Sequence, residues 1–231
     1  MPFAYYGAKH KLAPSYDLPL FDTIIEPFAG SAAYSCLYAA KSTKVILIEK
    51  DLRVVDLWHE LQEMTCIDLD RIESQLADKR CTHPLIGGIA GSSTLSATLN
   101  GKDRAVTPRM KSNWPPVRRR IESNLDKIKS WQIIPGSYID APDIEATWLI
   151  DPPYQPFKTM AGAVYRESSE NIDYKALGEW CSSRSGQIMV CEQQPAAWLP
   201  FTPHASQTNA IGDRRVEVLW KSGLEQSPSL F

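Results

Sequence analysis

The chain has 231 residues, 43% of them hydrophobic, and a formal net charge of −2 at pH 7. This length suits one α/β domain with an insertion, or a domain with a small subdomain. The charge excludes a globally basic nucleic-acid binder, and no apolar run approaches the ~18 residues of a membrane span. The first residues lack the form of a signal peptide, so we expect a soluble, cytoplasmic protein without a membrane partner.

The cysteines, the histidines and the distribution of charge limit the kinds of site that the chain can carry. The five cysteines include no CxxC pair and the four histidines show no ligand spacing, so neither a disulfide framework nor a metal site is predicted. Between Lys102 and Lys129, nine basic residues stand against three acidic ones, a local charge of +6 that leaves −8 for the remainder. The chain therefore carries one strongly basic segment.

The first elements predict a nucleotide-binding βα unit. Phe21 to Ile25 is rich in β-forming residues, and a turn of small residues follows before a helix from Ser31 to about Lys41. Gly30 lets the backbone of this turn approach a ligand closely, and the helix N-terminus offers free N–H groups. A second strand, Val45 to Ile48, ends in Glu49, which is placed to accept hydrogen bonds from ribose hydroxyls.

The middle of the chain reads as helical and basic. Periodicity from Asp51 to Leu76 predicts two core-packing helices, the first capped by Asp51. Residues 87–108 predict a polar, mobile loop, and Trp114-Pro115-Pro116 leads into a basic helix from about Val117 to Ser130. A charge run of this kind is usually a solvated helix face, but basic density beside a polar loop is also how a domain contacts phosphates.

The last hundred residues predict the rest of a sheet. We expect a helix from about Asp173 to Ser183 and a hairpin signal at Gly212-Asp213. The predicted strands are Trp131 to Ile134, Ala146 to Ile150, Gln187 to Cys191, one around Thr208, and Val216 to Trp220.

The strand that ends at Ile150 runs directly into Asp151-Pro152-Pro153-Tyr154. Neither proline can donate to a strand ladder, so the strand stops there and the backbone is pinned. The carboxyl end of a parallel strand is where ligands bind in α/β sheets. A carboxylate, the fixed carbonyl of Pro152 and the ring of Tyr154 predict a site for a flat molecule that bears an NH2 group. The alternative without a binding site is a strand that ends in a Pro-Pro turn with a surface tyrosine.

With these pieces in order, the chain resembles the Dam-like family of S-adenosylmethionine-dependent DNA N6-adenine methyltransferases over roughly residues 3–79 and 131–221. The opening aromatic-x-Gly-Gly-Lys motif of the family is similar to the segment at residues 5–9, and its Glu-Pro-Phe-x-Gly-x-Gly to the segment at 26–32. Its Ser-Tyr-x-Asp is similar to residues 137–140, and Asp-Pro-Pro-Tyr is present at 151–154. Ala8 and Ala32 replace glycines, Glu49 replaces the usual Asp, and the Arg-x-Asn recognition segment is not found between Pro84 and Trp114.

The resemblance implies a Rossmann-like methyltransferase sheet with a late antiparallel hairpin and a small helical and loop insertion for target recognition. Residues 1–60 and 131–223 would form the catalytic domain, residues 61–130 the insertion and 224–231 a disordered tail. The implied cofactor, S-adenosyl-L-methionine, would contact Tyr5, Gly7, Lys9, Pro27, Phe28, Ala29, Gly30, Ser31, Ala32, Glu49, Tyr138 and Asp151. The implied catalytic residues are Asp151, Pro152, Pro153 and Tyr154.

The implied reaction is methyl transfer to N6 of an adenine that is flipped out of DNA and stacked on Tyr154. The loop that contains Phe157, Lys158, Tyr165 and Arg166 would close over the base. The expected nucleic-acid contacts are Arg109, Lys111, Arg118, Arg119, Lys158 and Arg166.

Three alternatives stay open. They are an RNA adenine N6-methyltransferase, a DNA cytosine N4-methyltransferase, and a nucleic-acid-binding module that kept the fold but lost catalysis. We expect a monomer or weak dimer, and the short chain fits a stand-alone phage or mobile-element methylase in a bacterial cell or phage-infected host.

Overall fold

The computed structural model describes residues 1–3, 5, 9–76, 80–81, 83, 85, 104–155, 172–208 and 214–223. Several predictions fall outside these residues: most of the polar loop at 87–108, the loop at 156–171, the hairpin turn at 212–213 and the tail at 224–231. Among the described helices, none combines the length and the apolar character needed to cross a membrane.

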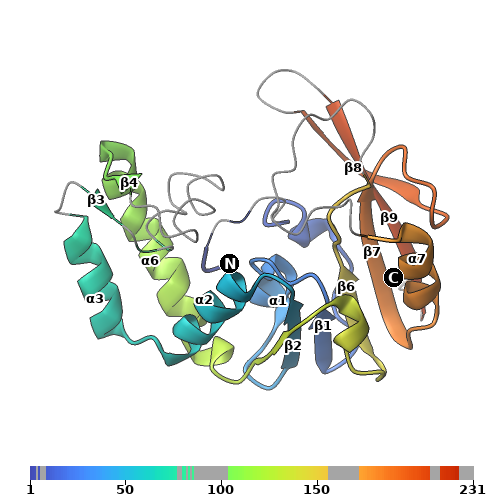
Figure 1. The fold of residues 1–231 in the computed structure, drawn as a ribbon, viewed down its shortest axis with the longest axis horizontal. Coiled ribbons are helices and arrows are strands. Elements are labelled where there is room, and N and C mark those ends of the chain that lie inside the picture. The colour runs from blue at the N-terminus through green and yellow to red at the C-terminus, as the bar shows by residue number, and fades with distance from the viewer. Residues whose placement is uncertain are drawn as a thin grey trace, which may run out of the picture.

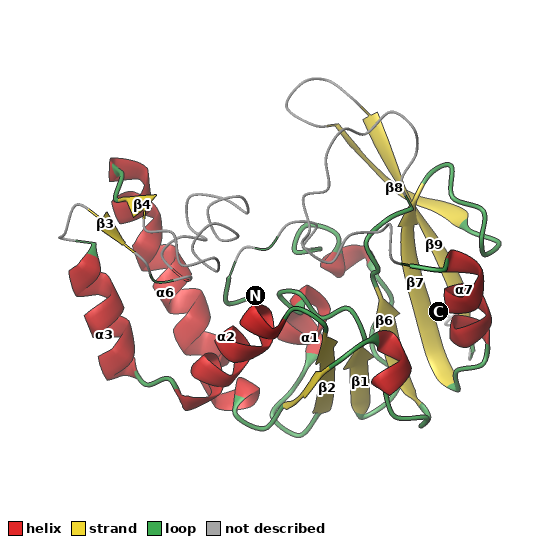
Figure 2. Cartoon of the chain, in the orientation of Figure 1, coloured by secondary structure: helices red, strands yellow, loops and turns green. Residues whose placement is uncertain are grey.

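Seven strands form one sheet in the order β5-β2-β1-β6-β7-β9-β8. Their bounds are β1 Thr23–Glu26, β2 Lys44–Glu49, β5 Gln132–Pro135, β6 Ala146–Ile150, β7 Gly186–Gln193, β8 Thr202–Thr208 and β9 Arg214–Ser222. The five strands from β5 to β7 run parallel, while β9 is antiparallel to both β7 and β8. The expected α/β sheet with a late antiparallel hairpin is therefore confirmed (Figures 1 and 2).

The strand order reverses between β1 and β6. From β1 the chain builds outward through β2 to β5, then returns to the other side of β1 and continues through β6 to β7. Such a reversal opens a crevice at the carboxyl ends of the two strands, and ligands of open α/β sheets bind there. The pairing of Ile25 with Trp148 brings the segments that follow β1 and β6 to the same edge.

The sheet separates two hydrophobic cores, because alternate side chains of each strand point to opposite faces. Ile24, Leu47 and Leu149 belong to one core, and their neighbours Ile25 and Trp148 belong to the other. The first core is covered by α1, α2, α3 and α6, and the second by α7. These helices are α1 Ala33–Tyr38, α2 Leu52–Glu63, α3 Cys66–Gln75, α6 Pro108–Ile128 and α7 Tyr174–Ser182.

The predicted insertion at 61–130 is continuous with the main core. The helices α3 and α6 extend side by side to one side of the sheet, with the short pair β3 (Arg80–Cys81) and β4 (Arg104–Ala105) near their ends (Figure 1). Ile121 and Ile128 of α6 nevertheless pack in the same cluster as Ile24 of β1. The carboxyl half of α6 is thus part of the scaffold that supports the sheet.

The prediction that the basic helix begins near Val117 is wrong, because α6 starts at Pro108 and runs through Pro115 and Pro116. The side chain of Thr107 accepts a hydrogen bond from the Met110 amide, so Thr107-Pro108 is an N-cap followed by proline at the first helical position. Both internal prolines are exposed, while Trp114 beside them is buried. Burial of this apolar face compensates the two missing N–H donors.

Two further boundaries differ from expectation. The helix predicted from Ser31 to about Lys41 is limited to Ala33–Tyr38, because Ala32 has a left-handed backbone, φ 44°, and Ala39 is extended. The strand expected around Thr208 begins earlier, at Thr202. Asp51 caps α2 as predicted, accepting a hydrogen bond from the Arg53 amide.

Glu26, the last residue of β1, ties the sheet to α1. Its side chain is 4% exposed, and its Oε1 accepts a hydrogen bond of 2.8 Å from the Ser35 amide. Burial raises the pKa of Glu26 to about 7, although the bonds from Ser35 oppose this rise. A carboxylate at this position is therefore unfavourable for folding at neutral pH.

We predict that Glu26→Gln flattens the pH dependence of stability. A carboxyl whose folded pKa lies above its unfolded value stabilises the fold fully only below the unfolded value, near pH 4, and this contribution is lost as pH rises through 7. Relative to the variant, the wild type should lose roughly 3 kcal/mol of unfolding free energy between pH 4 and pH 8, measured by urea denaturation.

The matched control is Glu63→Gln, at the exposed end of α2. It should follow the wild-type pH dependence. A Glu26→Gln curve parallel to the wild type would contradict the assignment.

Candidate functional site

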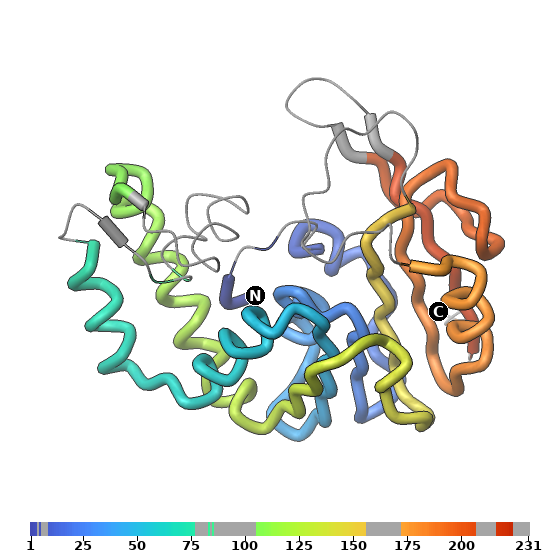
Figure 3. The backbone as a smooth tube through the Cα atoms, viewed as in Figure 1, coloured from blue at the N-terminus to red at the C-terminus, as the bar shows by residue number. Residues whose placement is uncertain are grey.

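The segments singled out in the sequence meet at the carboxyl edge of the parallel strands. The turn of residues 27–32 follows β1, Glu49 ends β2, and Asp151 follows β6. The N-terminus lies at this same edge (Figure 3). Tyr5 and Lys9 belong to this N-terminal segment.

The turn after β1 is fastened to β2 through Gly30. The Gly30 amide donates to Glu49 Oε2 at 2.9 Å, and its carbonyl accepts from the indole of Trp58 at 2.9 Å. Gly30 has φ 46°, and a Cβ added to it would lie 3.0 Å from the ring of Tyr5. The absence of a side chain therefore allows an aromatic ring to lie directly on the turn.

Glu49 is oriented by hydrogen bonds from the backbone. Its two carboxylate oxygens accept from the amides of Gly30 and Asp51, both at 2.9 Å. Burial raises the pKa of Glu49, opposed by these backbone bonds. Each carboxylate oxygen can accept more than one hydrogen bond, and Glu49 is only partly buried, so the group can still bind polar hydrogens from a ligand.

Aromatic rings border the same edge. Phe28 stacks on Tyr138 with ring centroids 5.7 Å apart and planes 27° apart. Tyr138 begins the 3-10 helix η2 (Tyr138–Asp140), whose capping box joins Ser137 to Asp140. The resemblance to Ser-Tyr-x-Asp thus falls on a turn that orients Tyr138, and Asp140 serves in that turn as the cap, accepting from the Ser137 amide at 2.7 Å.

The carboxylate of Asp151 faces the ammonium of Lys9. Lys9 Nζ lies 2.8 Å from Asp151 Oδ1, and the Lys9 side chain is 8% exposed. Burial lowers the pKa of Lys9, but the charges of Asp151 and then Glu217 outweigh it and raise the pKa overall. Burial raises the pKa of Asp151 to about 6, with Lys9 lowering it and Glu217 raising it. Each group therefore favours the ionised form of the other.

Tyr154 is fixed from two directions. Its ring lies 4.5 Å from Lys9 Nζ, measured to the ring centroid, which is a cation–π distance. Its phenol donates to Glu217 Oε2 at 2.8 Å, and the phenol of Tyr16 donates to Glu217 Oε1 at 2.7 Å. The ring of Tyr154 is thus held in one orientation beside the Lys9–Asp151 pair.

The backbone of the Asp-Pro-Pro-Tyr segment is anchored as well. The Pro153 carbonyl accepts from the Tyr174 phenol at 2.6 Å, and the Gln155 amide donates to Glu192 Oε2 at 3.1 Å. The same Glu192 oxygen accepts from the indole of Trp198 at 3.0 Å. Burial raises the pKa of Glu192 to about 7. Side chains from α7, β7 and the loop after β7 therefore hold the motif in place.

Four of the six expected nucleic-acid contacts lie on α6. Arg109, Lys111 and Arg119 are exposed. Arg118 instead forms ion pairs with Asp70, Glu73 and Glu122, joining α6 to α3. Its guanidinium is engaged within the fold, while the other three face solvent. Gly7, Lys158 and Arg166 lie outside the described residues.

Several polar side chains that hold the motif were not predicted from the sequence, among them Tyr16, Tyr174, Glu192 and Glu217. Glu192 and Glu217 are acids that follow or interrupt apolar stretches of their strands, and both are buried. An acid at a core-facing strand position needs a partner, so this pattern was a usable signal. Tyr16 carried no such signal, because tyrosines are common in ordinary cores.

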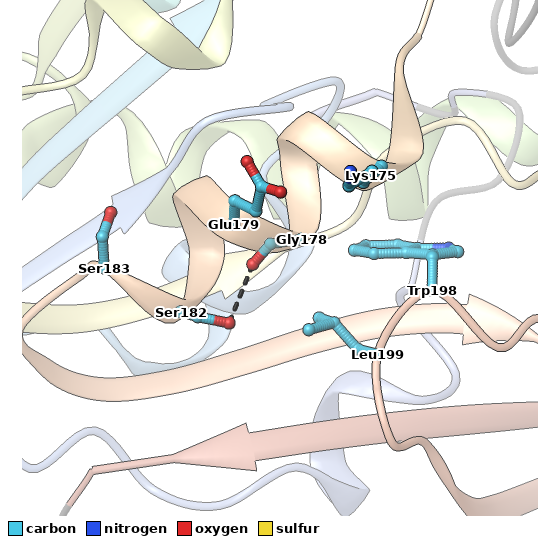
Figure 4. Close-up of a pocket in the computed structure, with 7 residues that line it drawn as sticks. All are labelled: Lys175, Gly178, Glu179, Ser182, Ser183, Trp198 and Leu199. Carbon is cyan, nitrogen blue, oxygen red and sulfur yellow. Dashed lines mark hydrogen bonds between the residues drawn. The ribbon is translucent and has the colours of Figure 1, made fainter.

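A separate surface hollow lies on α7, lined by Lys175, Gly178, Glu179, Ser182, Ser183, Trp198 and Leu199 (Figure 4). It contains none of the residues singled out from the sequence. Its lining combines the indole ring of Trp198 and the side chain of Leu199 with polar side chains of α7 and Ser183.

No protein-family model matches the chain, and no curated protein sequence matches it significantly.

We predict that Ala32→Gly is tolerated better than an ordinary alanine-to-glycine change. The left-handed conformation costs a non-glycine residue about 1–2 kcal/mol, and its relief offsets the lost methyl packing and the added chain entropy. The variant should be neutral or up to about 1 kcal/mol more stable in chemical denaturation. In the control Ala33→Gly, the first residue of α1, no strain is relieved and about 1 kcal/mol should be lost. Equal losses in the two variants would contradict this account of the turn.

Proposed function

We propose that this chain is a methyltransferase that moves a methyl group from S-adenosyl-L-methionine to N6 of adenine in DNA. The proposal rests chiefly on one observation. The Asp-Pro-Pro-Tyr segment lies beside the crevice between β1 and β6, with its carboxylate ion-paired to Lys9 and its tyrosine ring fixed next to that pair. The chemistry needed to hold a planar amine is thus gathered where α/β sheets bind their ligands.

The residues at this edge fit the proposed cofactor. Glu49 would accept the ribose hydroxyls, the bare backbone of Gly30 would allow close approach, and the stacked rings of Phe28 and Tyr138 would border the adenine. Asp151 and Glu217 carry two negative charges against the one positive charge of Lys9, which suits a cationic ligand. The cofactor supplies an electrophilic methyl group on a sulfonium.

The residues of the chain would orient the target amine. N6 of adenine is a weak nucleophile, because its lone pair is delocalised into the ring. Hydrogen bonds from N6–H to the Asp151 carboxylate and the Pro152 carbonyl would localise that lone pair on the nitrogen. Most of the rate would come from positioning, which can contribute ~7–11 kcal/mol. Asp151 need not be a strong base, since the amine becomes acidic only after methylation.

A base inside a duplex cannot reach such a site, so the adenine would be flipped out at a cost of a few kcal/mol. Tyr154 would stack on it, and the exposed Arg109, Lys111 and Arg119 of α6 would contact phosphates. Arg118 is not part of this proposed interface, because its guanidinium is already paired with acidic side chains of the fold. RNA adenine and DNA cytosine N4 would need the same amine contacts, so the product nucleoside decides between the three substrates.

The first test replaces the carboxylate. Purified wild type and Asp151→Asn are incubated with adenine-containing duplex DNA or RNA and methyl-labelled cofactor, and the nucleosides are separated after digestion. We expect N6-methyladenine from DNA with the wild type, and at least a ~100-fold lower rate with the variant, the loss typical of misplaced reacting groups.

The control is Asp143→Asn, an exposed acid that pairs with Arg184 before β6. It should retain the wild-type rate. Wild-type methylation by Asp151→Asn, or no labelled nucleoside from the wild type, would contradict the proposal.

The second test separates stacking from hydrogen bonding at Tyr154. Tyr154→Ala removes the ring and should weaken DNA binding by ~1–3 kcal/mol, measured by fluorescence titration with an extrahelical target adenine. Tyr154→Phe keeps the ring and removes only the bond to Glu217, so it should bind such DNA close to the wild-type affinity. If both variants lose the same affinity, the ring is not the stacking surface.

A further inference from the structure

Glu217 contacts three polar side chains around the Asp-Pro-Pro-Tyr segment, although it lies on the last strand of the chain. It is 8% exposed and lies on β9, opposite Gln193 of β7 and Ala205 of β8. Its carboxylate accepts the phenol protons of Tyr16 and Tyr154. One of its oxygens, Oε1, also lies 3.9 Å from Lys9 Nζ.

Lys9 is therefore within reach of two carboxylates, at unequal distances. It is 2.8 Å from Asp151 and 3.9 Å from Glu217. The two distances differ by about an ångström, so a small movement of the ammonium can bring it into closer contact with Glu217. Because the Lys9 side chain is 8% exposed, its charge cannot simply turn outward into water when one partner is engaged elsewhere.

The proposed reaction engages that partner. To accept hydrogen bonds from a target amine, the Asp151 carboxylate must give up part of its contact with the ammonium. The positively charged sulfonium of the methyl donor, bound beside Asp151, would also push Lys9 away from Asp151. A buried ammonium left without a counter-charge costs several kcal/mol, so a second acid within reach removes a barrier to substrate binding.

We propose that Glu217 is a positioning residue of the methyl-transfer site: it receives Lys9 when Asp151 takes up the target amine, and it fixes the ring of Tyr154. This inference rests on the proposed function. Glu217 acts through Lys9 and Tyr154 and touches neither the base nor the cofactor. The charge on Glu217 is thus required for turnover, beyond its role as an acceptor for two phenols.

The role of charge can be tested through pH, because Asp151 must be ionised to accept the amine. Among the described residues, the titratable groups coupled electrostatically to Asp151 include Lys9, Tyr16, Glu26, Tyr154, Cys191, Glu192 and Glu217. Glu217 raises the pKa of Asp151, whereas Lys9 lowers it. Removing the charge of Glu217 should therefore lower the pKa of Asp151 directly, and also leave Lys9 more fully on Asp151.

The decisive variant is Glu217→Gln, which keeps the shape of the side chain and a carbonyl acceptor. We expect kcat to fall by up to about 100-fold, the scale of an ångström misplacement, and the acid limb of the kcat/KM profile to move to lower pH. Glu217→Asp keeps the charge and should leave the limb near its wild-type position. Tyr16→Phe removes one bond to Glu217 without changing charge, so its limb should also stay in place.

Asp143→Asn is the control, since it neutralises an exposed acid that pairs with Arg184. Its acid limb should coincide with that of the wild type whatever its rate. An unmoved limb and an undiminished kcat in folded Glu217→Gln would overturn this inference while the proposed function stands. A wild type without methyl transfer would overturn both.

Discussion

The geometry of the site depends on the ion pair between Lys9 and Asp151. A lysine that is 8% exposed and 2.8 Å from a carboxylate joins the N-terminal segment to the end of β6, two parts of the chain separated by more than half of its length. Breaking one partner of such a pair leaves a buried charge uncompensated, which is strongly destabilising. The same pair places Lys9 over the ring of Tyr154, so one contact positions both the carboxylate and the aromatic surface.

The sheet determines why these groups meet. Parallel strands bring their carboxyl ends to one edge, and the reversal between β1 and β6 places the turn of Gly30 beside Asp151. The antiparallel strand β9 then carries Glu217 back to the same region from the far end of the chain. Burial raises the pKa values of the scaffold acids Glu26 and Glu192 to about 7, well above the usual range of a surface acid.

Much of this arrangement could be predicted from the sequence. The apolar runs, the N-cap at Asp51 and the proline pair at 152–153 located the strands, a helix start and the motif, because each reports a local backbone requirement. Long-range polar contacts could not be read in this way. Nothing local to Arg118 reveals that α3 would present Asp70 and Glu73 to it, and nothing local to Tyr16 shows that its phenol reaches Glu217. The start of α6 was missed although Thr107-Pro108 is a recognisable local signal.

The most direct test is a crystal structure of the chain with S-adenosylhomocysteine, which keeps the adenosine and amino-acid parts of the proposed cofactor. We expect the ribose hydroxyls to bond Glu49 and the sulfur atom to lie beside Asp151, at the carboxyl ends of β1, β2 and β6. A ligand bound away from that edge, or a crevice closed to it by the side chains around Lys9, would contradict the account.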